Sequence, residues 1–382
     1  MSQSNNMNID LFREQILAAA KNKTPLSIEG GGTKSWYGNA NSYAKLDTRP
    51  YSGILEYQPE ELVITACAGT SLKEIEAALA EKNQVLAFEP PHFGDTATFG
   101  GAIAAGLAGP GRISAGNLRD FVLGARILDG KGQDLSFGGK VMKNVAGYDV
   151  SRLLPGSMGT LSLLLEASVK VLPRPAATTS LRCNITQARA LQLLNEWAGQ
   201  PLPLSASCWI GSSKGGDGEL TIRLAGAAAA VKAAIPLMGA AVNATELDPK
   251  VATEFWVALR EQQLAVFSKP SSDETLYRLA LPAACGPLAL ENVSGDIALE
   301  WHGQQRWFTA PGDDATFASM KALANANGGH ATRFKQGDSV DPSKQRFTLL
   351  SEQAHSTALE AVQARLRAAF DPAGVFATSR LP

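Results

Sequence analysis

The chain has 382 residues, which at roughly 100–200 residues per domain indicates two domains with cores of their own. Its 35 basic and 36 acidic residues leave a net charge of -1, and the lack of a basic stripe argues against a nucleic-acid partner. Residues 1–8 lack the pattern of a signal peptide, and no run of about 18 apolar residues is present that would span a bilayer. We therefore expect a cytoplasmic protein whose attachment to a membrane, if any, is made through partners.

The cysteines and histidines are scattered and lack the close spacing of a zinc or iron–sulfur site. They are Cys67, Cys183, Cys208 and Cys285, and His92, His302, His330 and His355. This pattern predicts reduced, mostly buried thiols and no metal held by this chain alone.

Hydrophobic periodicity predicts a mixture of helices and short strands up to Pro175. Helices are expected at residues 9–21, 71–82 and 99–107, and strands at 25–28, 53–57, 62–66, 121–128 and 161–171. Ser71 and Glu74 have the spacing of a capping box at the start of the second helix.

The sequence changes character after Pro173-Arg174-Pro175, where the glycine motifs stop. Helices are expected at residues 188–197, 227–238, 315–325 and 354–370, and strands at 206–210, 219–224, 297–299 and 307–309. The alternation suits an antiparallel sheet with helices on one side. The whole chain therefore reads as an α+β protein.

Four motifs of glycine and hydroxyl residues precede this boundary. The first is Gly30, Gly31 and Gly32, which follow a predicted strand and can present successive backbone N–H groups to an anion. Thr33 adds a hydroxyl and Lys34 a positive charge. A glycine triplet by itself is more often an ordinary loop.

The second motif places Thr96, Thr98, Gly100 and Gly101 where a helix begins. The free N–H groups and partial positive charge of a helix N-terminus favour a pyrophosphate there. The alternative is a helix packed closely on a sheet, which also calls for glycine.

The third motif is residues 112–120 with Asn117 and Arg119, and its alternative is a solvated polar loop. The fourth is Gly147-Tyr148-Asp149 with the later Gly156-Ser157-Met158-Gly159-Thr160-Leu161. A tight turn before an apolar strand offers backbone groups to an adenine or a ribose.

The order of the four motifs resembles the FAD-binding domain of the vanillyl-alcohol-oxidase-type (PCMH-type) flavoproteins. The resemblance covers residues 25–175, and residues 369–376 match the family's C-terminal return to the flavin domain. It implies a two-lobed FAD-binding domain at 1–175, an α/β cap domain with an antiparallel sheet at 176–350, and a returning helix and tail at 351–382. The chain does not resemble a Rossmann fold, because no Gly-x-Gly-x-x-Gly follows its first strand.

Within that family, residues 89–94, 140–149 and 300–303 are similar to the FAD-binding subunits of glycolate oxidases. The resemblance implies FAD pyrophosphate at Gly30 to Lys34 and at Thr98, Gly100 and Gly101. It further implies flavin contacts near Pro90, Asn117, Arg119 and Gly147, with the adenosine end near Ser157, Gly159 and Thr160.

Two departures from the family bear on the cofactor. Some members attach FAD covalently through a histidine in the first glycine loop, whereas this loop has Thr33 and Lys34, so we expect non-covalent FAD. The family tail continues as Asn-Pro-Gly-Arg, whereas this chain reads Ala377-Thr378-Ser379-Arg380 and shares only the arginine.

The family's 2-hydroxy-acid dehydrogenases share a His-x-Gly-Asp-Gly-Asn-x-His motif that this sequence lacks. Oxidation of a hydroxy acid needs a base near the hydroxyl and a cation for the carboxylate. His302 as the base and Arg306 as the cation are the local candidates. The favoured alternative is that His302 only packs beside Trp301 and Trp307.

Three functions remain open. In the first, the chain is an FAD-carrying subunit of a glycolate-oxidising complex. It relays electrons or assists assembly between a catalytic FAD subunit and an iron–sulfur subunit, in the cytoplasm or peripheral to the inner membrane. In the second, it is a stand-alone FAD-dependent dehydrogenase of a small 2-hydroxy acid or an alditol. In the third, it is a scaffold with a vestigial flavin site.

Overall fold

The computed structural model describes residues 3–39, 41–139, 149–290, 293–342, 346–347, 356–376 and 380–381. The chain separates into two compact units. The first unit comprises Met1–Ala108, Asn117–Arg174 and Leu349–Pro382, and the second comprises Gly109–Gly116 and Pro175–Thr348. We call them the flavin unit and the cap unit, after the domains that the resemblance led us to expect. Residues 109–116 thus belong to the cap unit, although the sequence analysis places them in the first domain.

The flavin unit is built on a five-stranded antiparallel sheet. Its strands run in the order β3 (Ile54–Gln58), β4 (Val63–Cys67), β8 (Leu163–Lys170), β6 (Val122–Leu128) and β7 (Asp134–Gly138). A separate parallel pair joins β1 (Leu26–Glu29) to β2 (Ala44–Asp47), and an antiparallel pair joins β5 (Gln84–Val85) to β9 (Leu172–Pro173).

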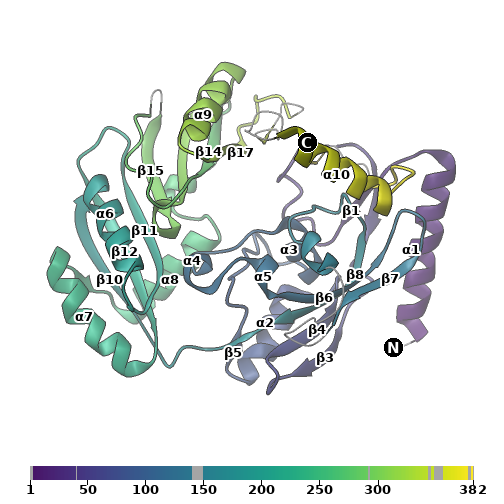
Figure 1. The fold of residues 1–382 in the computed structure, drawn as a ribbon, viewed down its shortest axis with the longest axis horizontal. Helices are drawn as coiled ribbons and strands as arrows, with labels where there is room; N and C mark the ends of the chain where they lie inside the picture. Colours follow the sequence, from purple (N-terminus) through teal and green to yellow (C-terminus); the bar gives the residue numbers. More distant parts are fainter. Residues whose placement is uncertain are drawn as a thin grey trace. The chain divides into compact units, whose positions relative to one another are not determined.

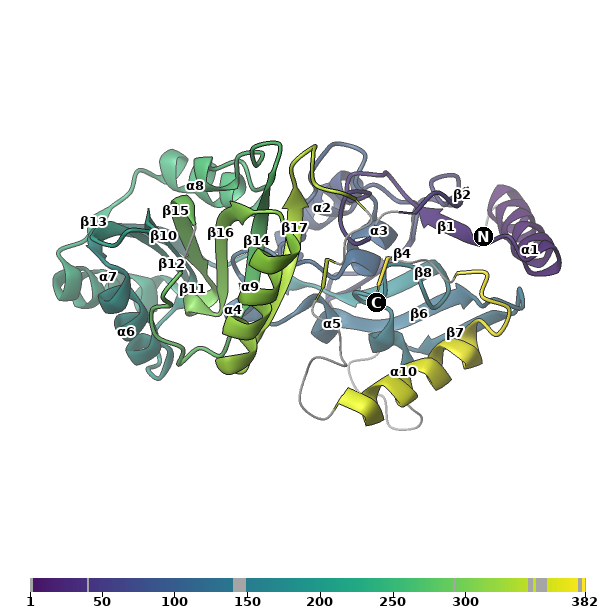
Figure 2. The same ribbon diagram turned by 90° about the horizontal axis from the view of Figure 1, so that it is seen from above.

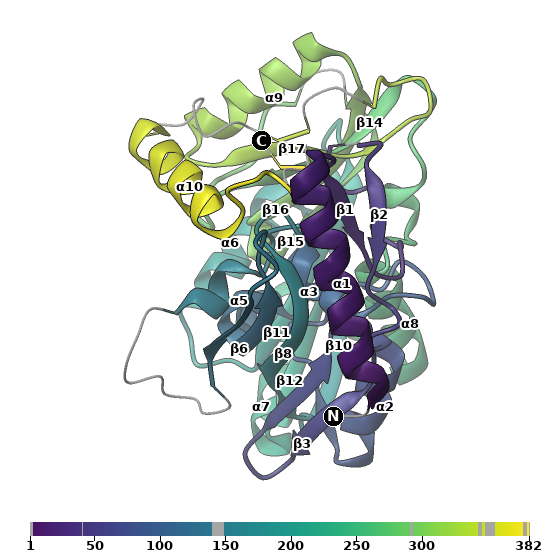
Figure 3. The ribbon, with the colours of Figure 1, turned by 90° about the vertical axis from the view of Figure 1, so that its right-hand side faces the viewer.

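The helices of the flavin unit are mostly short. They are α1 (Gln3–Asn22), α2 (Leu72–Glu81), α3 (Phe99–Ala105), α5 (Leu118–Phe121), the 3-10 turn Val150–Leu153 and α10 (Ser356–Phe370). The helix α1 lies beside β1 and β2 (Figure 3) and buries Ile9, Phe12 and Ile16 in a core shared with Leu163 and Phe376. Figure 2 shows α10 beside β7, where the rings of Phe137 and Phe370 are 6.1 Å apart.

The cap unit is built on an eight-stranded antiparallel sheet. Its order is β13 (Thr245–Glu246), β10 (Ala177–Thr186), β12 (Asp217–Gly226), β11 (Leu204–Ser212), β15 (Ser294–Glu300), β16 (Gln305–Pro311), β14 (Glu274–Ala280) and β17 (His330–Gln336). The helices α6 (Gln187–Ala198), α7 (Ala228–Val242) and α9 (Asp314–Ala326) share one buried core with it (Figure 1). Short helical turns lie at α4 (Arg112–Ala115), Ala265–Phe267 and Trp301–Gly303.

A fourth helix, α8 (Pro249–Arg260), covers the opposite face of this sheet (Figure 2). The Trp256 indole donates to Ser180 Oγ at 2.8 Å, and the Arg223 guanidinium lies 5.1 Å from the Trp256 ring. The expectation of helices on one side only was wrong, because α8 was not predicted.

The α+β class and the antiparallel cap sheet are confirmed. The predicted helices and strands before Pro175 are present with shifted ends. The capping box of α2 is only half formed: Ser71 Oγ accepts the Lys73 N–H at 3.2 Å, and no bond returns from Glu74 within the described residues. Of the last predicted helix, residues 354–355 lie outside the described residues, and α10 starts at Ser356.

Candidate functional site

The first glycine loop offers a row of backbone donors. The N–H groups of Gly31, Gly32 and Thr33 have no acceptor within the described part of the chain, and Gly32 has the left-handed φ of 72°. Successive unpaired N–H groups in such a loop form a concave anion site. The loop is held by Thr96, whose Oγ1 donates to Gly31 O at 2.7 Å. A side chain at Gly31 would lie 1.5 Å from Thr96 O, so glycine is required there.

The start of α3 differs from the expected open helix N-terminus. The N–H groups of Phe99, Gly100 and Gly101 donate to Thr70 O at 2.8 Å, Ala68 O at 2.8 Å and Thr98 Oγ1 at 3.2 Å, respectively. A Cβ on Gly100 would lie 2.5 Å from that of Ala68, which favours the close-packing explanation of this glycine. These residues therefore shape the site, and few of their N–H groups remain for a ligand.

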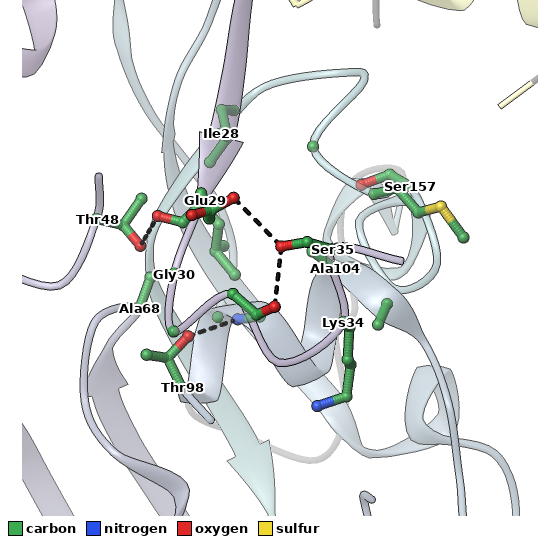
Figure 4. A pocket seen from close by; sticks show the side chains of 18 of the residues that line it. Ile28, Glu29, Gly30, Lys34, Ser35, Thr48, Ala68, Thr98, Ala104 and Ser157 are labelled. Atoms are coloured by element: carbon green, nitrogen blue, oxygen red, sulfur yellow. Dashed lines mark hydrogen bonds between the residues drawn. The ribbon is translucent and has the colours of Figure 1, made fainter. Parts of the chain in front are cut away.

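A pocket of about 880 Å³, counted with its open mouth, adjoins the loop and α3 (Figure 4). Of the residues expected at the cofactor, those that line it are Gly30, Gly31, Gly32, Thr33, Lys34, Thr98, Gly100, Gly101, Ser157 and Gly159. Pro90, Asn117, Arg119 and Thr160 do not line it. Gly147 lies outside the described residues.

The residues that do not line the pocket have other surroundings in the structure. Asn117 caps α5, with its backbone N–H donating to Asp120 Oδ2 at 2.8 Å, and Arg119 is exposed. Pro90 is buried, and Thr160 Oγ1 donates to Ser157 O at 2.7 Å. Thr160 thus stabilises the turn that carries Ser157.

The turn at residues 156–160 is held against α3. Met158 N donates to Ala104 O at 2.8 Å, and Gly156 N donates to Ile103 O at 3.1 Å. A Cβ on Gly106 would lie 2.7 Å from the Gly156 backbone. Only glycine at position 106 therefore lets the end of α3 pack this closely against the turn. This contact fixes the wall to which Ser157 and Gly159 contribute.

Two cations reach the pocket from distant parts of the sequence. Lys34 Nζ donates to His92 O at 3.2 Å. Arg380, in the C-terminal tail, donates from Nη2 to Ser35 O at 3.2 Å, and its own carbonyl accepts from Asn39 N at 3.1 Å. Burial lowers the pKa of Arg380 because its charge is removed from water. An anion in the pocket would offset that cost.

Two buried polar atoms beside the pocket have no protein partner within the described residues. They are Arg380 Nε and the Ser162 hydroxyl, and Ser162 is 4% exposed. A buried polar group without a partner is costly, and a bound ligand is one explanation of it. The donors of the glycine loop, two cations and a hydroxyl fit a pyrophosphate with attached sugars. Sequence reasoning missed Ser162, because nothing in its neighbourhood marks it as a ligand contact.

The cap candidates His302 and Arg306 are both buried in the cap unit. His302 is 7% exposed, Nε2 has no partner within the described residues, and burial lowers its pKa to about 4. Arg306 is 2% exposed and donates to Gly303 O at 3.0 Å, Gly286 O at 2.7 Å and Cys285 O at 2.5 Å. The Arg306 guanidinium thus binds backbone carbonyls, which favours a packing role over a carboxylate clamp.

The 112–120 motif is divided between the two units. Within the cap unit, the Trp301 indole donates to Gly109 O at 3.0 Å, and the Arg112 guanidinium lies 4.4 Å from the Trp301 ring centre. Ser114 Oγ donates to Ser205 O at 3.0 Å. Trp301 and His302 both have left-handed φ angles, of 53° and 57°, which is uncommon for side chains of this size. A strained turn therefore holds residues 109–116.

Comparison with known proteins identifies the family of this chain. The FAD binding domain family matches residues 9–138. Over 368 residues the chain is 44% identical to the glycolate oxidase subunit GlcE of Escherichia coli, covering 96% of this chain and 95% of that protein. The chain belongs to the family of glycolate oxidase subunit GlcE. This family assignment confirms the predicted resemblance and makes the chain an FAD-binding oxidoreductase.

Further relatives of this GlcE-family chain match over shorter stretches. It is 32% identical to a D-lactate dehydrogenase of Archaeoglobus fulgidus over 50% of this chain and 43% of that protein. It is 30% identical to the glycolate oxidase subunit GlcD of Bacillus subtilis over 46% of this chain and 37% of that protein. Alkyldihydroxyacetonephosphate synthase has the same fold, with a TM-score of 0.64 at 15% identity over 95% of this chain and 74% of that chain.

No group of three or more His, Cys, Asp or Glu side chains is placed to hold a metal ion within the part of the chain that the structure describes. No helix among those same residues has the length and apolar character needed to cross a bilayer.

Proposed function

We propose that this chain is the FAD-binding subunit of a glycolate oxidase complex, which assists the oxidation of glycolate to glyoxylate by electron relay or assembly. The observation that carries the proposal is the pocket lined by the Gly31–Thr33 donors and by Arg380, whose Nε has no partner among the described residues, in a chain 44% identical to a GlcE subunit. The pocket brings backbone N–H donors and two cations together, as the pyrophosphate of FAD requires.

The proposed cofactor contacts follow from the chemistry of these donors. The N–H groups of Gly31, Gly32 and Thr33 bind pyrophosphate oxygens, while Lys34 and Arg380 offset its charge. Bound FAD supplies a two-electron acceptor. The glycine loop has no histidine, so the FAD is non-covalent. Mild acid should release all the flavin, and flavin retained by the denatured chain would contradict this assignment.

We assign substrate oxidation to a partner subunit. Glycolate must lose a hydride from its α-carbon and a proton from its hydroxyl, and the proton requires a base. His302 is only 7% exposed and its pKa is about 4, so it is poorly suited to that role. The partner is therefore a catalytic FAD subunit, and the electrons pass through the complex.

An iron–sulfur subunit is the proposed electron acceptor of the complex. Cys67, Cys183 and Cys208 are buried, and burial raises the pKa of each thiol, which disfavours the thiolate that iron requires. A cluster would thus be carried by another chain. The proposed location is the cytoplasm, with peripheral attachment to the inner membrane through the complex.

A visible absorption spectrum of the purified chain tests the proposal, before and after glycolate is added without oxygen. Flavin bands should persist with glycolate alone and bleach once the catalytic partner is added. Bleaching by the chain alone would instead support a stand-alone dehydrogenase, which the similarity to D-lactate dehydrogenase favours as the second candidate. A chain without flavin after expression with its partners would be a scaffold.

A further inference from the structure

The wall of the cofactor pocket contains a carboxylate. Among the described residues that line the pocket, Glu29 is the acidic one, whereas Lys34 and Arg380 are basic. Its side chain is 22% exposed. Since the pocket is proposed to hold an anionic cofactor, a carboxylate here repels the phosphates unless it makes a favourable contact elsewhere on the ligand.

Two neighbours hold the Glu29 carboxylate beside the glycine loop. Lys45 Nζ on β2 donates to Glu29 Oε1 at 2.8 Å. Ser35 Oγ lies 3.2 Å from Glu29 Oε2 (Figure 4). The Glu29 carbonyl accepts from Thr48 N at 2.9 Å, which fixes the backbone at this point. A Cβ on Gly32 would lie 3.6 Å from Glu29 Oε1, so the carboxylate lies directly beside the proposed phosphate loop.

Glu29 keeps room for a ligand donor. A carboxylate has about four lone-pair positions, of which Lys45 uses one. The single proton of the Ser35 hydroxyl can go to Gly32 O at 2.9 Å or to Glu29, but not to both at once. The carboxylate can therefore accept a further hydrogen bond from the pocket.

The two common flavin nucleotides present different groups to this carboxylate. FMN ends in a phosphate monoester that carries about −1.5 to −2 charges near pH 7. In FAD each phosphate is linked on both sides and carries one charge, and a ribose with two free hydroxyls follows. A carboxylate repels the first group, whereas it accepts a charge-assisted hydrogen bond from a hydroxyl.

We infer that Glu29 makes the site selective for FAD over FMN. It accepts a hydrogen bond from a ribose hydroxyl of FAD and repels the terminal phosphate of FMN. Glu29 lines the same pocket as Ser157 and Gly159, the residues expected at the adenosine end. The inference rests on the proposed FAD site and is independent of the proposed reaction.

Titration of the deflavinated full chain with FAD and with FMN, followed by flavin fluorescence, tests the inference. Glu29→Gln should weaken FAD binding about tenfold, the loss expected for one charge-assisted hydrogen bond, and should strengthen FMN binding. Lys45→Met removes the positive charge paired with the Glu29 carboxylate, so it should weaken FMN binding more than FAD binding. The two variants thus move the FAD-to-FMN ratio in opposite directions.

Glu74→Gln removes an exposed carboxylate from α2 and is the matched control that should leave both affinities unchanged. If wild-type chain binds FAD but neither Glu29→Gln nor Lys45→Met changes the ratio, the inference is overturned while the FAD site stands. If wild-type chain binds neither flavin, the proposed function falls as well. Circular dichroism of each variant separates loss of binding from loss of folding.

Discussion

The guanidinium of Arg112 lies 4.4 Å from the ring centre of Trp301, whose indole N–H is bonded to Gly109 O at 3.0 Å. The two residues are far apart in sequence, yet they are neighbours in the cap unit. Trp301 therefore fixes residues 109–116 by a cation–π contact and a hydrogen bond at once.

Trp301→Ala should release this segment. A cation–π contact and a hydrogen bond together contribute about 2 kcal/mol, so trypsin should cut after Arg112 about tenfold faster or more. Mass spectrometry of timed digests measures the rate, with the exposed Lys214 in the β11–β12 turn as the internal reference. Trp301→Phe keeps the ring and should be intermediate. Equal cleavage in all three proteins would contradict the holding role.

Arg380→Gln should weaken FAD binding. Charged hydrogen bonds contribute about 1.5–3 kcal/mol, which corresponds to roughly a tenfold to hundredfold higher Kd. Fluorescence titration of the deflavinated chain measures it. Arg365→Gln, on the exposed face of α10, is the control and should bind FAD normally. An unchanged Kd for Arg380→Gln would remove the C-terminal tail from the cofactor site.

Glu166→Gln should destabilise the flavin unit. Glu166 Oε1 accepts hydrogen bonds from Tyr51 Oη at 2.5 Å and from Arg126 Nη1 at 2.7 Å. The Glu166 side chain is only 13% exposed. Because Arg126 keeps its contacts to Asp134, we expect a loss of about 2 kcal/mol in the free energy of unfolding.

Urea unfolding measures that loss. Tyr51→Phe, which leaves the Glu166–Arg126 pair intact, should cost about 1 kcal/mol. Lys73→Met removes an exposed ion pair with Asp95 and should have no measurable effect. A Glu166→Gln chain as stable as Lys73→Met would show that the buried network contributes nothing net.

The buried His302 should make the cap unit less stable in mild acid. Its pKa is about 4 when folded, below the ordinary 6.5, so the unfolded chain binds the proton first as pH falls. The stabilising contribution is complete above pH about 6.5 and is lost between there and pH about 4, by about 2 kcal/mol at pH 5.

His302→Asn tests this, since asparagine tolerates the left-handed backbone at this position. Urea unfolding at pH 7 and pH 5 should show a smaller acid loss for the variant than for wild type. Burial also lowers the pKa of His330. Because His330 is present in both proteins, its contribution to the acid loss is the same in each and cancels in the difference. Equal losses would mean that His302 is protonated in the folded chain.

The sequence alone allowed prediction of the longer elements up to Pro175, because their apolar periodicity and turn residues are local signals. It also located the glycine loop, because the same glycines allow the left-handed backbone and present N–H groups to an anion. It missed the shorter strands β2, β5 and β7 and the single turn α5. The helix α8 was missed, although its start is well marked. Asp248 caps it by accepting hydrogen bonds from Lys250 N and Val251 N, and Pro249 is its first residue. That capping signal, with Ala252, Trp256 and Leu259 at helical spacing, was sufficient to find it.

The remaining pocket residues depend on tertiary placement. Arg380 meets Ser35 across 345 residues, and no local pattern predicts such a pairing. At Gly100 and Gly101 the prediction was wrong in another way: a helix N-terminus led us to expect backbone N–H groups free to bind a ligand. The structure shows those N–H groups bonded to protein acceptors, because close packing of α3 brings Ala68 O and Thr98 Oγ1 within reach.

The position of Arg380 also determines when the pocket is complete. Leu26 N on β1 donates to Val375 O at 2.8 Å, so the strand that leads into the glycine loop is completed by residues near the end of the chain. A ribosome makes the N-terminal elements first, at about 5–20 residues per second. The glycine loop therefore lacks the contacts of Val375 and Arg380 until these residues have been made, long after the loop itself.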